Sequence, residues 1–251
     1  MTSPARRHMQ QVLARKAAGT SGTGPAPMPT SGAVGQEYAL LRAALGEDLR
    51  RLSQIQSVER KIAAKRGMIA RYRDWITGAL AAERPAQDDI VTHMMVWAID
   101  IADWPLALDL ARHVIAHRLT LPERYKRTPA TLIAEEVAEA GLAPVAIVDL
   151  TTLQVVDDLT EDEDMPDEVR AKLRKAIGLA FKARAEAFDP EAESAPAGAR
   201  PALIAAALDH LRRALELDSG CGVKKLIEGL EREAKKLREA AASNTPATPD
   251  T

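Results

Sequence analysis

Between Gln36 and about Ala82, apolar positions follow a helical period. Four isoleucines recur every seven residues, at Ile55, Ile62, Ile69 and Ile76, and leucines at positions 41, 45, 49 and 52 extend the same face upstream. A seven-residue repeat is typical of a coiled-coil seam. The pattern predicts one long helix over this segment. The positions three residues after each isoleucine include a lysine and a tyrosine, so an antiparallel helix or a neighbouring subunit could cover the face equally well.

Helix-capping signals continue along the rest of the chain. Asp103 followed by Pro105 predicts a helix to about residue 118, and Thr128 followed by Pro129 predicts another to about residue 140. Asp164 is expected to cap a helix that ends near residue 187. Further helices are predicted at about 87–101, 202–218 and 223–242. The β-branched residues of 145–158 would allow a strand, but they do not alternate cleanly, so we predict a helix there as well.

The predicted fold class is therefore all-α, with a long basic helix followed by a helical bundle, and with a disordered arm and a disordered tail. The segments Trp104–His117 and Ala207–Asp218 resemble tetratricopeptide helices, because small residues lie beside long aliphatic ones. No 34-residue register is sustained, so we predict a partly tetratricopeptide-like bundle and not a repeat array.

Composition divides the chain into four parts. Residues 1–35 are expected to form a basic arm and a flexible linker, because Gly19–Gly35 is almost entirely Gly, Pro, Ser, Thr and Ala. The arm contains Arg6, Arg7, Arg15 and Lys16 and no acidic residue. Residues 36–84 are the long basic helix, a candidate for DNA binding or oligomerisation. Residues 85–242 are the helical body, and 243–251 are expected to be a disordered tail.

The formal net charge of -2 conceals a strong local excess of positive charge. Between residues 50 and 73, eight basic residues face a single acid, Glu59, which gives a formal charge of +7. The eight are Arg50, Arg51, Arg60, Lys61, Lys65, Arg66, Arg71 and Arg73. Such a stripe favours salt-sensitive binding of DNA with little sequence preference. The alternative is a solvated helix face that pairs with acids elsewhere in the protein.

An acidic run lies further along the chain. It comprises Asp157, Asp158, Glu161, Asp162, Glu163, Asp164, Asp167 and Glu168, with no basic residue among them. A divalent metal site of a nuclease would need such carboxylates. The interpretation that we favour is a solvated loop with acids at the N-terminus of the next helix. A third interpretation is docking to the basic stripe of a neighbouring subunit.

Other candidate chemistry is weak. His113 and His117 have a spacing that can chelate zinc, but no third ligand is evident. The single cysteine, Cys221, fits a reducing compartment and a packing position. Phosphate-binding loops and nucleophile elbows are absent. We therefore assign no catalytic residue, metal or cofactor. No apolar run approaches the roughly 18 residues of a membrane span, and the start of the chain lacks a signal-peptide core, so we expect no membrane contact.

Sequence segments along nearly the whole chain resemble a known family, the small terminase subunit (GpM type) of temperate contractile-tailed phages. The segments are Met1–Met9, Trp75–Ile76, Gln87–Ile90, Met95–Asp100, Ala107–Arg112, Leu119–Pro122, Lys126–Pro129, Glu135–Ala138, Asp164–Leu173 and Gly222–Lys225. The chain departs from the family in a longer linker, a neutral tail where some relatives have lysines, and the lack of a clear helix-turn-helix. We therefore do not expect the tail to contact DNA.

This resemblance implies a function in viral DNA packaging. Such a subunit would bind double-stranded viral DNA at the cohesive-end site, in the cytoplasm of a host cell. It would assemble with a large ATPase subunit for cleavage and packaging, and it would form a homo-oligomer, usually a ring. Family members also carry the name terminase endonuclease subunit, but the residues here show no independent catalytic site. Two alternatives stay open: a metal-dependent endonuclease in its own right, and a helical adaptor without DNA contact.

Overall fold

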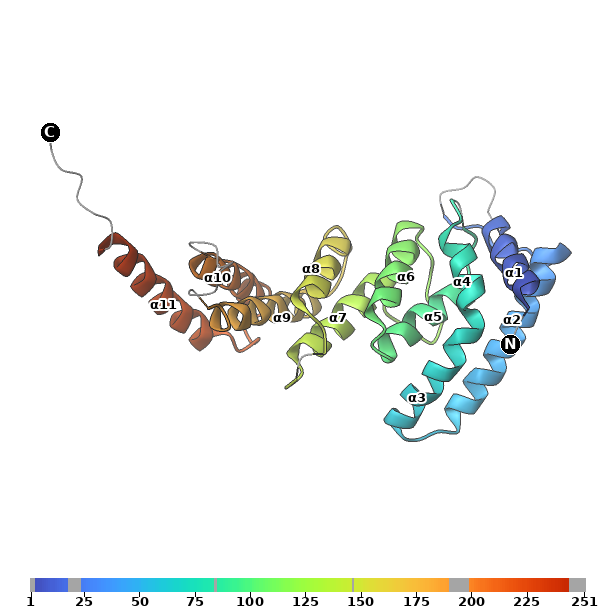
Figure 1. Ribbon diagram of the computed structural model, residues 1–251, viewed down its shortest axis with the longest axis horizontal. Coiled ribbons are helices and arrows are strands. Elements are labelled where there is room, and N and C mark those ends of the chain that lie inside the picture. Colours follow the sequence, from blue (N-terminus) through green and yellow to red (C-terminus); the bar gives the residue numbers. More distant parts are fainter. Residues whose placement is uncertain (1–2, 18–23, 84, 146, 190–198, 244–251) are drawn as a thin grey trace. The chain divides into compact units, whose positions relative to one another are not determined.

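The computed structural model describes residues 3–17, 24–83, 85–145, 147–189 and 199–243 (Figure 1). Within these ranges the regular elements are all helical, apart from one isolated β-bridge between Pro27 and Gln87. The predicted all-α class is confirmed. None of the helices in this part of the chain is long and apolar enough to cross a membrane. Backbone contacts divide the chain into two compact units, Met1–Ile133 and Ala134–Thr251.

The first unit contains most of the helices. They are α1 (Pro4–Lys16), α2 (Gly32–Ser53), α3 (Val58–Met68), the 3-10 helix η1 (Ile69–Tyr72), α4 (Arg73–Leu80), α5 (Asp89–Asp100) and α6 (Trp104–Ala116). Helix α7 (Pro129–Leu142) contains the boundary between the units. Two predicted caps are confirmed. The Asp103 carboxylate accepts the backbone N–H of Leu106 at 3.4 Å, and the Thr128 hydroxyl accepts that of Thr131 at 3.1 Å.

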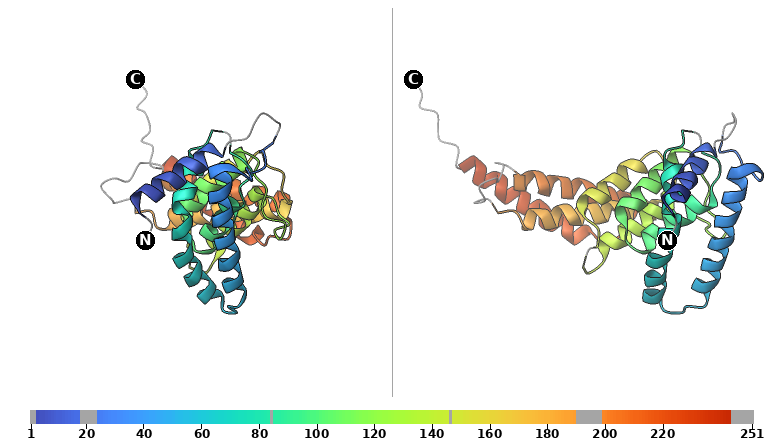
Figure 2. Two further views of the ribbon diagram at one scale, coloured as in Figure 1. Left: turned by 90° about the vertical axis from the view of Figure 1, so that its right-hand side faces the viewer. Right: turned by 45° about the vertical axis from the view of Figure 1, so that its right-hand side comes forward.

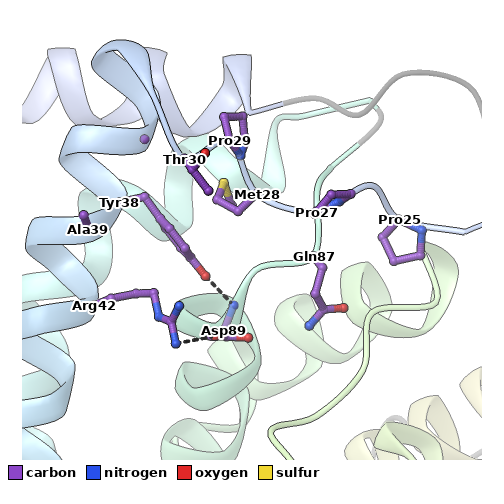
Figure 3. Close-up of a pocket in the computed structure, with 11 residues that line it drawn as sticks. Pro25, Pro27, Met28, Pro29, Thr30, Tyr38, Ala39, Arg42, Gln87 and Asp89 are labelled. Atoms are coloured by element: carbon purple, nitrogen blue, oxygen red, sulfur yellow. Dashed lines mark hydrogen bonds and ion pairs between the residues drawn. The ribbon is translucent and has the colours of Figure 1, made fainter.

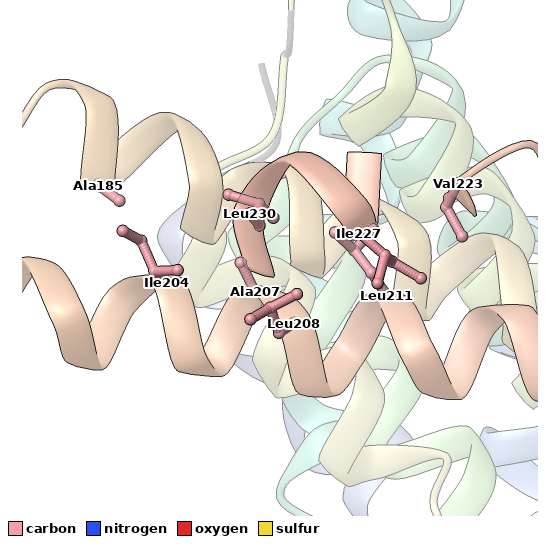
Figure 4. Close-up of a cluster of buried hydrophobic side chains, with 8 residues drawn as sticks. All are labelled: Ala185, Ile204, Ala207, Leu208, Leu211, Val223, Ile227 and Leu230. Atoms are coloured by element: carbon pink, nitrogen blue, oxygen red, sulfur yellow. The ribbon is translucent and has the colours of Figure 1, made fainter. Parts of the chain in front are cut away.

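The second unit continues with α8 (Leu150–Leu159), α9 (Asp167–Glu186), α10 (Ala199–Leu217) and α11 (Lys224–Ser243). Buried side chains of α9, α10 and α11 form one core cluster (Figure 4). Gly178 allows α9 to approach α10 closely, because a Cβ at this position would lie 2.6 Å from Cγ of Leu211. The helix predicted over residues 145–158 is confirmed for residues 150–158, which lie in α8; its predicted start is too early, because Asp149 occupies the N-cap position. The cap predicted at Asp164 is wrong, since Pro166 occupies the cap position of α9 without a side-chain hydrogen bond.

Helices are present where tetratricopeptide-like segments were predicted, as α6 and α10. Their presence does not confirm the tetratricopeptide likeness itself. The predicted tail, residues 243–251, lies outside the described residues except for Ser243, which ends α11.

The long helix predicted from Gln36 to Ala82 is wrong, because the chain folds back into a hairpin of α2 and α3 (Figures 1 and 2). Ser57 starts the second arm: its hydroxyl accepts the backbone N–H of Arg60 at 3.3 Å, the geometry of a helix N-cap. Glu59 adds a negative charge to the first turn of α3, where the helix dipole favours it. Ile55, one of the four repeating isoleucines, therefore lies in the turn and not on a continuous seam.

The prediction of a disordered arm is also wrong. The described part of the arm is the helix α1, which packs against α4 and α2. Ala14 of this helix is 3% exposed. The facing position on α4 is Gly78, where a Cβ would lie only 2.2 Å from the carbonyl oxygen of Gln11. Small residues on both helices therefore allow their backbones to approach, and this contact orders the arm.

The described part of the linker, residues 24–31, is held against α2 and the start of α5 (Figure 3). The backbone N–H of Gln87 donates to the carbonyl oxygen of Ala26 at 2.7 Å. Together with Tyr38, the segment lines a cavity of about 540 Å³. Prolines reduce the conformational entropy that such a segment loses on ordering. The prediction of a flexible linker is thus wrong for these residues, and residues 18–23 lie outside the described part.

A buried carboxylate, Asp88, connects α4 to α5. Its Oδ2 accepts the Nε1–H of the fully buried Trp75 at 2.7 Å, and its Oδ1 accepts the backbone N–H groups of Ile90 and Val91 at 2.8 and 3.1 Å. Burial raises the pKa of Asp88 to about 6, while the hydrogen bonds from Trp75 and the backbone act in the opposite direction. Asp88 is the N-cap of α5, and this cap depends on the hydrogen bond from the Trp75 N–H for part of its stabilisation.

Candidate nucleic-acid interface

The eight basic residues predicted to bind DNA do not form one stripe. The structure distributes them over four elements: Arg50 and Arg51 in the last turn of α2, Arg60, Lys61, Lys65 and Arg66 in α3, Arg71 in η1, and Arg73 at the start of α4. They divide into two groups. Members of the first group form ion pairs or hydrogen bonds within the first unit, and members of the second lie at the closed end of the hairpin.

Three of the eight bind groups at the end of α5 and the start of α6. These contacts are Lys65 with the carboxylate of Asp100, Arg66 Nη2 with the carbonyl oxygen of Ile101 at 3.2 Å, and Arg73 with the carboxylate of Asp103 at 3.4 Å. The alternative of pairing with acids elsewhere in the protein is therefore correct for Lys65 and Arg73. Their charges are partly neutralised, so we expect them to contribute less to binding of an external anion.

Asp48 of α2 is a buried carboxylate that holds two further arginines. Its Oδ2 accepts the hydroxyl of Tyr72 at 2.8 Å and lies 3.4 Å from Nη1 of Arg71, while its Oδ1 lies 3.9 Å from Nη1 of Arg51. Burial raises the pKa of Tyr72, so its hydroxyl stays protonated and donates. The side chains of Arg71 and Arg51 are 49% and 63% exposed. Asp48 thus fixes α2 to η1 and keeps both arginines at the surface.

Asp48 was not singled out from the sequence. The signal was present, because this acid lies three residues after Leu45 and four before Leu52, on the apolar face of a predicted helix. A charged residue at such a position is expected to find a buried partner.

The remaining positive charge is at the closed end of the hairpin. Arg50, Arg60 and Lys61 form no ion pair among the described residues, and Arg51 has only its long contact with Asp48. These four side chains lie three or four residues from the turn at 54–57, which is about one helical turn. We call Arg50, Arg51, Arg60 and Lys61 the hairpin tip. Arg50, Arg51 and Arg60 are exposed and Lys61 is half-buried. Surface cations whose charge is not neutralised by an internal acid are suited to contact phosphate groups.

A groove of about 1040 Å³ lies between α1, α2 and the η1–α4 segment, and we call it the arginine groove. Four arginines from two distant parts of the sequence line it, Arg6, Arg7, Arg71 and Arg73. Its two acids are already bound within the first unit: Glu37 accepts Nε2 of Gln10 at 2.6 Å and Asp74 accepts Nε2 of Gln11 at 3.3 Å. Leu40 also lines the groove and is 60% exposed.

The acidic run forms the turn between α8 and α9. Asp157 points inward and pairs with Arg174 at 2.8 Å, and its burial raises its pKa. The other seven carboxylates are exposed. Among the described residues no group of three or more His, Cys, Asp and Glu side chains could hold a metal ion, so the metal interpretation gains no geometric support. Asp167 and Glu168 lie in the first turn of α9, as the favoured interpretation predicted.

The two candidate zinc ligands are neighbours on and just after α6. The ring centroids of His113 and His117 are 4.7 Å apart. Burial lowers the pKa of His113 to about 4, so its ring is neutral at physiological pH. Its Nε2 is buried without a hydrogen-bond partner, and the pair belongs to no group of three or more potential metal ligands among the described residues. Cys221 is partly buried against the α9–α11 cluster.

Comparisons with known proteins agree with one another. A family model described as phage small terminase subunit matches residues 42–168. The chain is 38% identical to the "Terminase, endonuclease subunit" of Escherichia phage P2, over 98% of this chain and 92% of that protein. It is 24% identical to the "Probable terminase, endonuclease subunit" of Haemophilus phage HP1 (strain HP1c1), over 77% of this chain and 69% of that protein. No solved structure matches the chain.

Proposed function

The chain belongs to the phage small terminase subunit family and has a role in phage DNA packaging, and from this premise we propose that it is the DNA-recognition subunit of the packaging machinery. It binds double-stranded viral DNA at the cohesive-end site through the hairpin tip. It assembles as a homo-oligomer with the large ATPase subunit in the host cytoplasm, so that the DNA is cut and packaged into the capsid.

The observation that supports the DNA contact is the lack of internal partners at the hairpin tip. Arg50, Arg60 and Lys61 are not paired within the described residues, whereas Lys65 and Arg73 are. Each cation that binds a phosphate releases about one condensed counterion, which gives binding that weakens steeply as salt rises. The closed end of the α2–α3 hairpin also extends away from the packed body of the first unit (Figures 1 and 2).

Replacing the four hairpin-tip residues with alanine is expected to weaken DNA binding equally on all sequences. The slope of log K against log salt is negative, and loss of four phosphate contacts should reduce its magnitude by about 3 to 4. The measurement is fluorescence anisotropy of the full chain on two labelled duplexes, one with the cohesive-end site and one with a scrambled copy, across a salt series.

A matched control removes four exposed lysines from α11, at positions 224, 225, 235 and 236. This variant has the same change in net charge and should keep the slope of the unmodified chain. Equal slopes for the hairpin-tip variant and the unmodified chain would move the DNA site elsewhere.

The two duplexes also test recognition. Tighter binding to the cohesive-end duplex supports sequence recognition by this subunit. Equal binding to both would mean that this subunit binds DNA without sequence preference, and that sequence specificity arises only in the assembled complex. Lack of binding to both at low salt supports the helical adaptor without DNA contact.

The printed name of the two relatives, endonuclease subunit, favours a second candidate function. If the chain were a metal-dependent nuclease through its acidic run, the purified protein with Mg²⁺ or Mn²⁺ would nick cohesive-end DNA without a large subunit. Loss of nicking in Asp162→Ala or Asp164→Ala would then be required to assign the reaction to these carboxylates. We expect no nicking, because the cutting chemistry is proposed to lie on the large subunit.

A further inference from the structure

We propose that the arginine groove of one copy of the chain binds the turn between α8 and α9 of a second copy, and that this contact builds the homo-oligomer. We call residues 158–168 the acidic turn. The inference rests on the proposed homo-oligomer, but it is independent of the DNA site at the hairpin tip. It assigns the two surfaces that meet, which neither the family nor the relatives specify.

The first observation is the segregation of charge between the two units. The unit Met1–Ile133 contains 19 basic and 12 acidic side chains, a formal charge of +7. The unit Ala134–Thr251 contains 15 basic and 24 acidic side chains, a formal charge of -9. Opposite charges of this size on two units of one chain attract the unlike units of separate copies and repel the like units.

The second observation is the composition of the arginine groove. Arginine presents a planar fork of donors that matches a carboxylate, and Arg7 has no ion-pair partner among the described residues. Arg6 and Arg71 are each 49% exposed although each contacts an acid of its own unit. The groove also contains Leu40, 60% exposed, which a protein surface would cover and a phosphate backbone would not. This mixture favours a protein segment over DNA as the occupant.

The third observation concerns the acidic turn. Seven of its carboxylates are exposed and make no ion pair in the described part of the chain: Asp158, Glu161, Asp162, Glu163, Asp164, Asp167 and Glu168. The turn is nevertheless fixed in shape, because Arg170 Nη2 donates to the carbonyl oxygens of Thr160 and Glu163 at 2.7 and 2.9 Å. A preformed turn loses little entropy on binding, and arginines from outside would relieve the repulsion among its carboxylates.

Because the two surfaces lie on different parts of each copy, the contact is heterologous. Each copy uses its groove on one neighbour and its turn on the next, so the assembly closes into a ring or extends as a chain. Since the contact depends on exposed charges, salt should weaken it.

Complementary charge reversal tests the proposal in the full chain. The groove variant is Arg6→Glu with Arg7→Glu, and the turn variant is Asp162→Lys with Asp164→Lys. We expect the unmodified chain to assemble at low salt, measured by sedimentation velocity, and to dissociate as salt rises. Each variant alone should stay monomeric at concentrations about tenfold above those at which the unmodified chain assembles. An equal mixture of the two should assemble again, because each reversed surface now faces a complementary one.

The mixture separates the proposal from simple misfolding, since a misfolded variant would not be rescued. A control variant, Asp209→Lys with Glu228→Lys, makes the same charge change on exposed positions of α10 and α11 and should assemble like the unmodified chain. A monomeric unmodified chain at low salt, variants that assemble normally, or a mixture that stays monomeric would each overturn the proposal.

The same samples distinguish this proposal from the DNA-binding function. If the groove variant assembles normally but loses DNA affinity, the groove is a nucleic-acid site and the second-copy proposal is overturned. If the hairpin-tip alanine variant assembles normally while it loses DNA affinity, the two surfaces are separate, as we propose. Failure of DNA binding alone leaves the sedimentation result unaffected.

Discussion

Replacing Trp75 with alanine is expected to lower the free energy of unfolding of the first unit by about 4 kcal/mol. The indole is fully buried, and its ring centroid lies 5.7 Å from that of Tyr38. Truncation removes this apolar surface from the core and leaves a cavity that α4 and α5 can only partly close. It also removes the Nε1–H donor from the buried Asp88 carboxylate. The carboxylate then has fewer hydrogen bonds to offset the free-energy cost of its burial.

The measurement is urea denaturation followed by tryptophan fluorescence. All three tryptophans, at positions 75, 97 and 104, lie in the first unit, so the signal reports on that unit even when Trp75 is absent. The comparison variant is Trp75→Phe, which keeps most of the ring and loses the donor, and it should cost about 1 to 2 kcal/mol. A loss below 1 kcal/mol for the alanine variant would show that the side chain is not buried as the structure has it.

Replacing Gly78 with valine is expected to detach α1 from α4. A Cβ at this position would lie 2.2 Å from the carbonyl oxygen and 2.7 Å from the Cα of Gln11, and 2.8 Å from the Cβ of Ala14. Two of these atoms belong to backbone, which cannot move aside without the whole helix. Overpacking of this kind costs roughly 1 to 3 kcal/mol or more, so undocking of α1 becomes the favourable response. Trypsin cleavage after Arg15 should accelerate on the order of tenfold, because local opening exposes the peptide bond.

The matched control is Gly46→Ala on α2, where a Cβ meets no atom within 4 Å. Alanine in a helix interior should stabilise the first unit by about 0.5 to 1 kcal/mol, because glycine loses more backbone entropy on folding. Its trypsin pattern should equal that of the unmodified chain. If Gly78→Val leaves cleavage after Arg15 unchanged, α1 is not docked on α4 in solution.

The helices after residue 85 could largely be predicted from the sequence because their starts depend on local side chains. Asp103 and Thr128 cap helices by hydrogen bonds to residues three positions away, and a single sequence contains that information. The α2–α3 hairpin could not be recognised from the isoleucine repeat, since the period is the same in one helix or two. Ser57 followed by Glu59 is the local signal for the break, because a serine hydroxyl can cap a helix that begins at the next residue.

Local sequence signals could not predict that α1 is ordered. They also could not predict which basic residues are paired with acids and which are not. Helix α1 depends on the fit of Ala14 to Gly78, which are 64 positions apart. Lys65 and Arg73 find their acids 35 and 30 residues further along the chain. Such pairings follow from tertiary packing, so the sequence indicated a basic segment but not which of its charges stay free.

The segregation of charge also has a practical consequence for handling the protein. The isoelectric point of about 6.2 is an average that describes neither unit. Near neutral pH the first unit offers a net positive charge to a sulfonate resin, and the second unit offers a net negative charge to a quaternary-amine resin. It should therefore be retained by both kinds of ion exchanger, and a purification scheme designed from the net charge would choose only one of them.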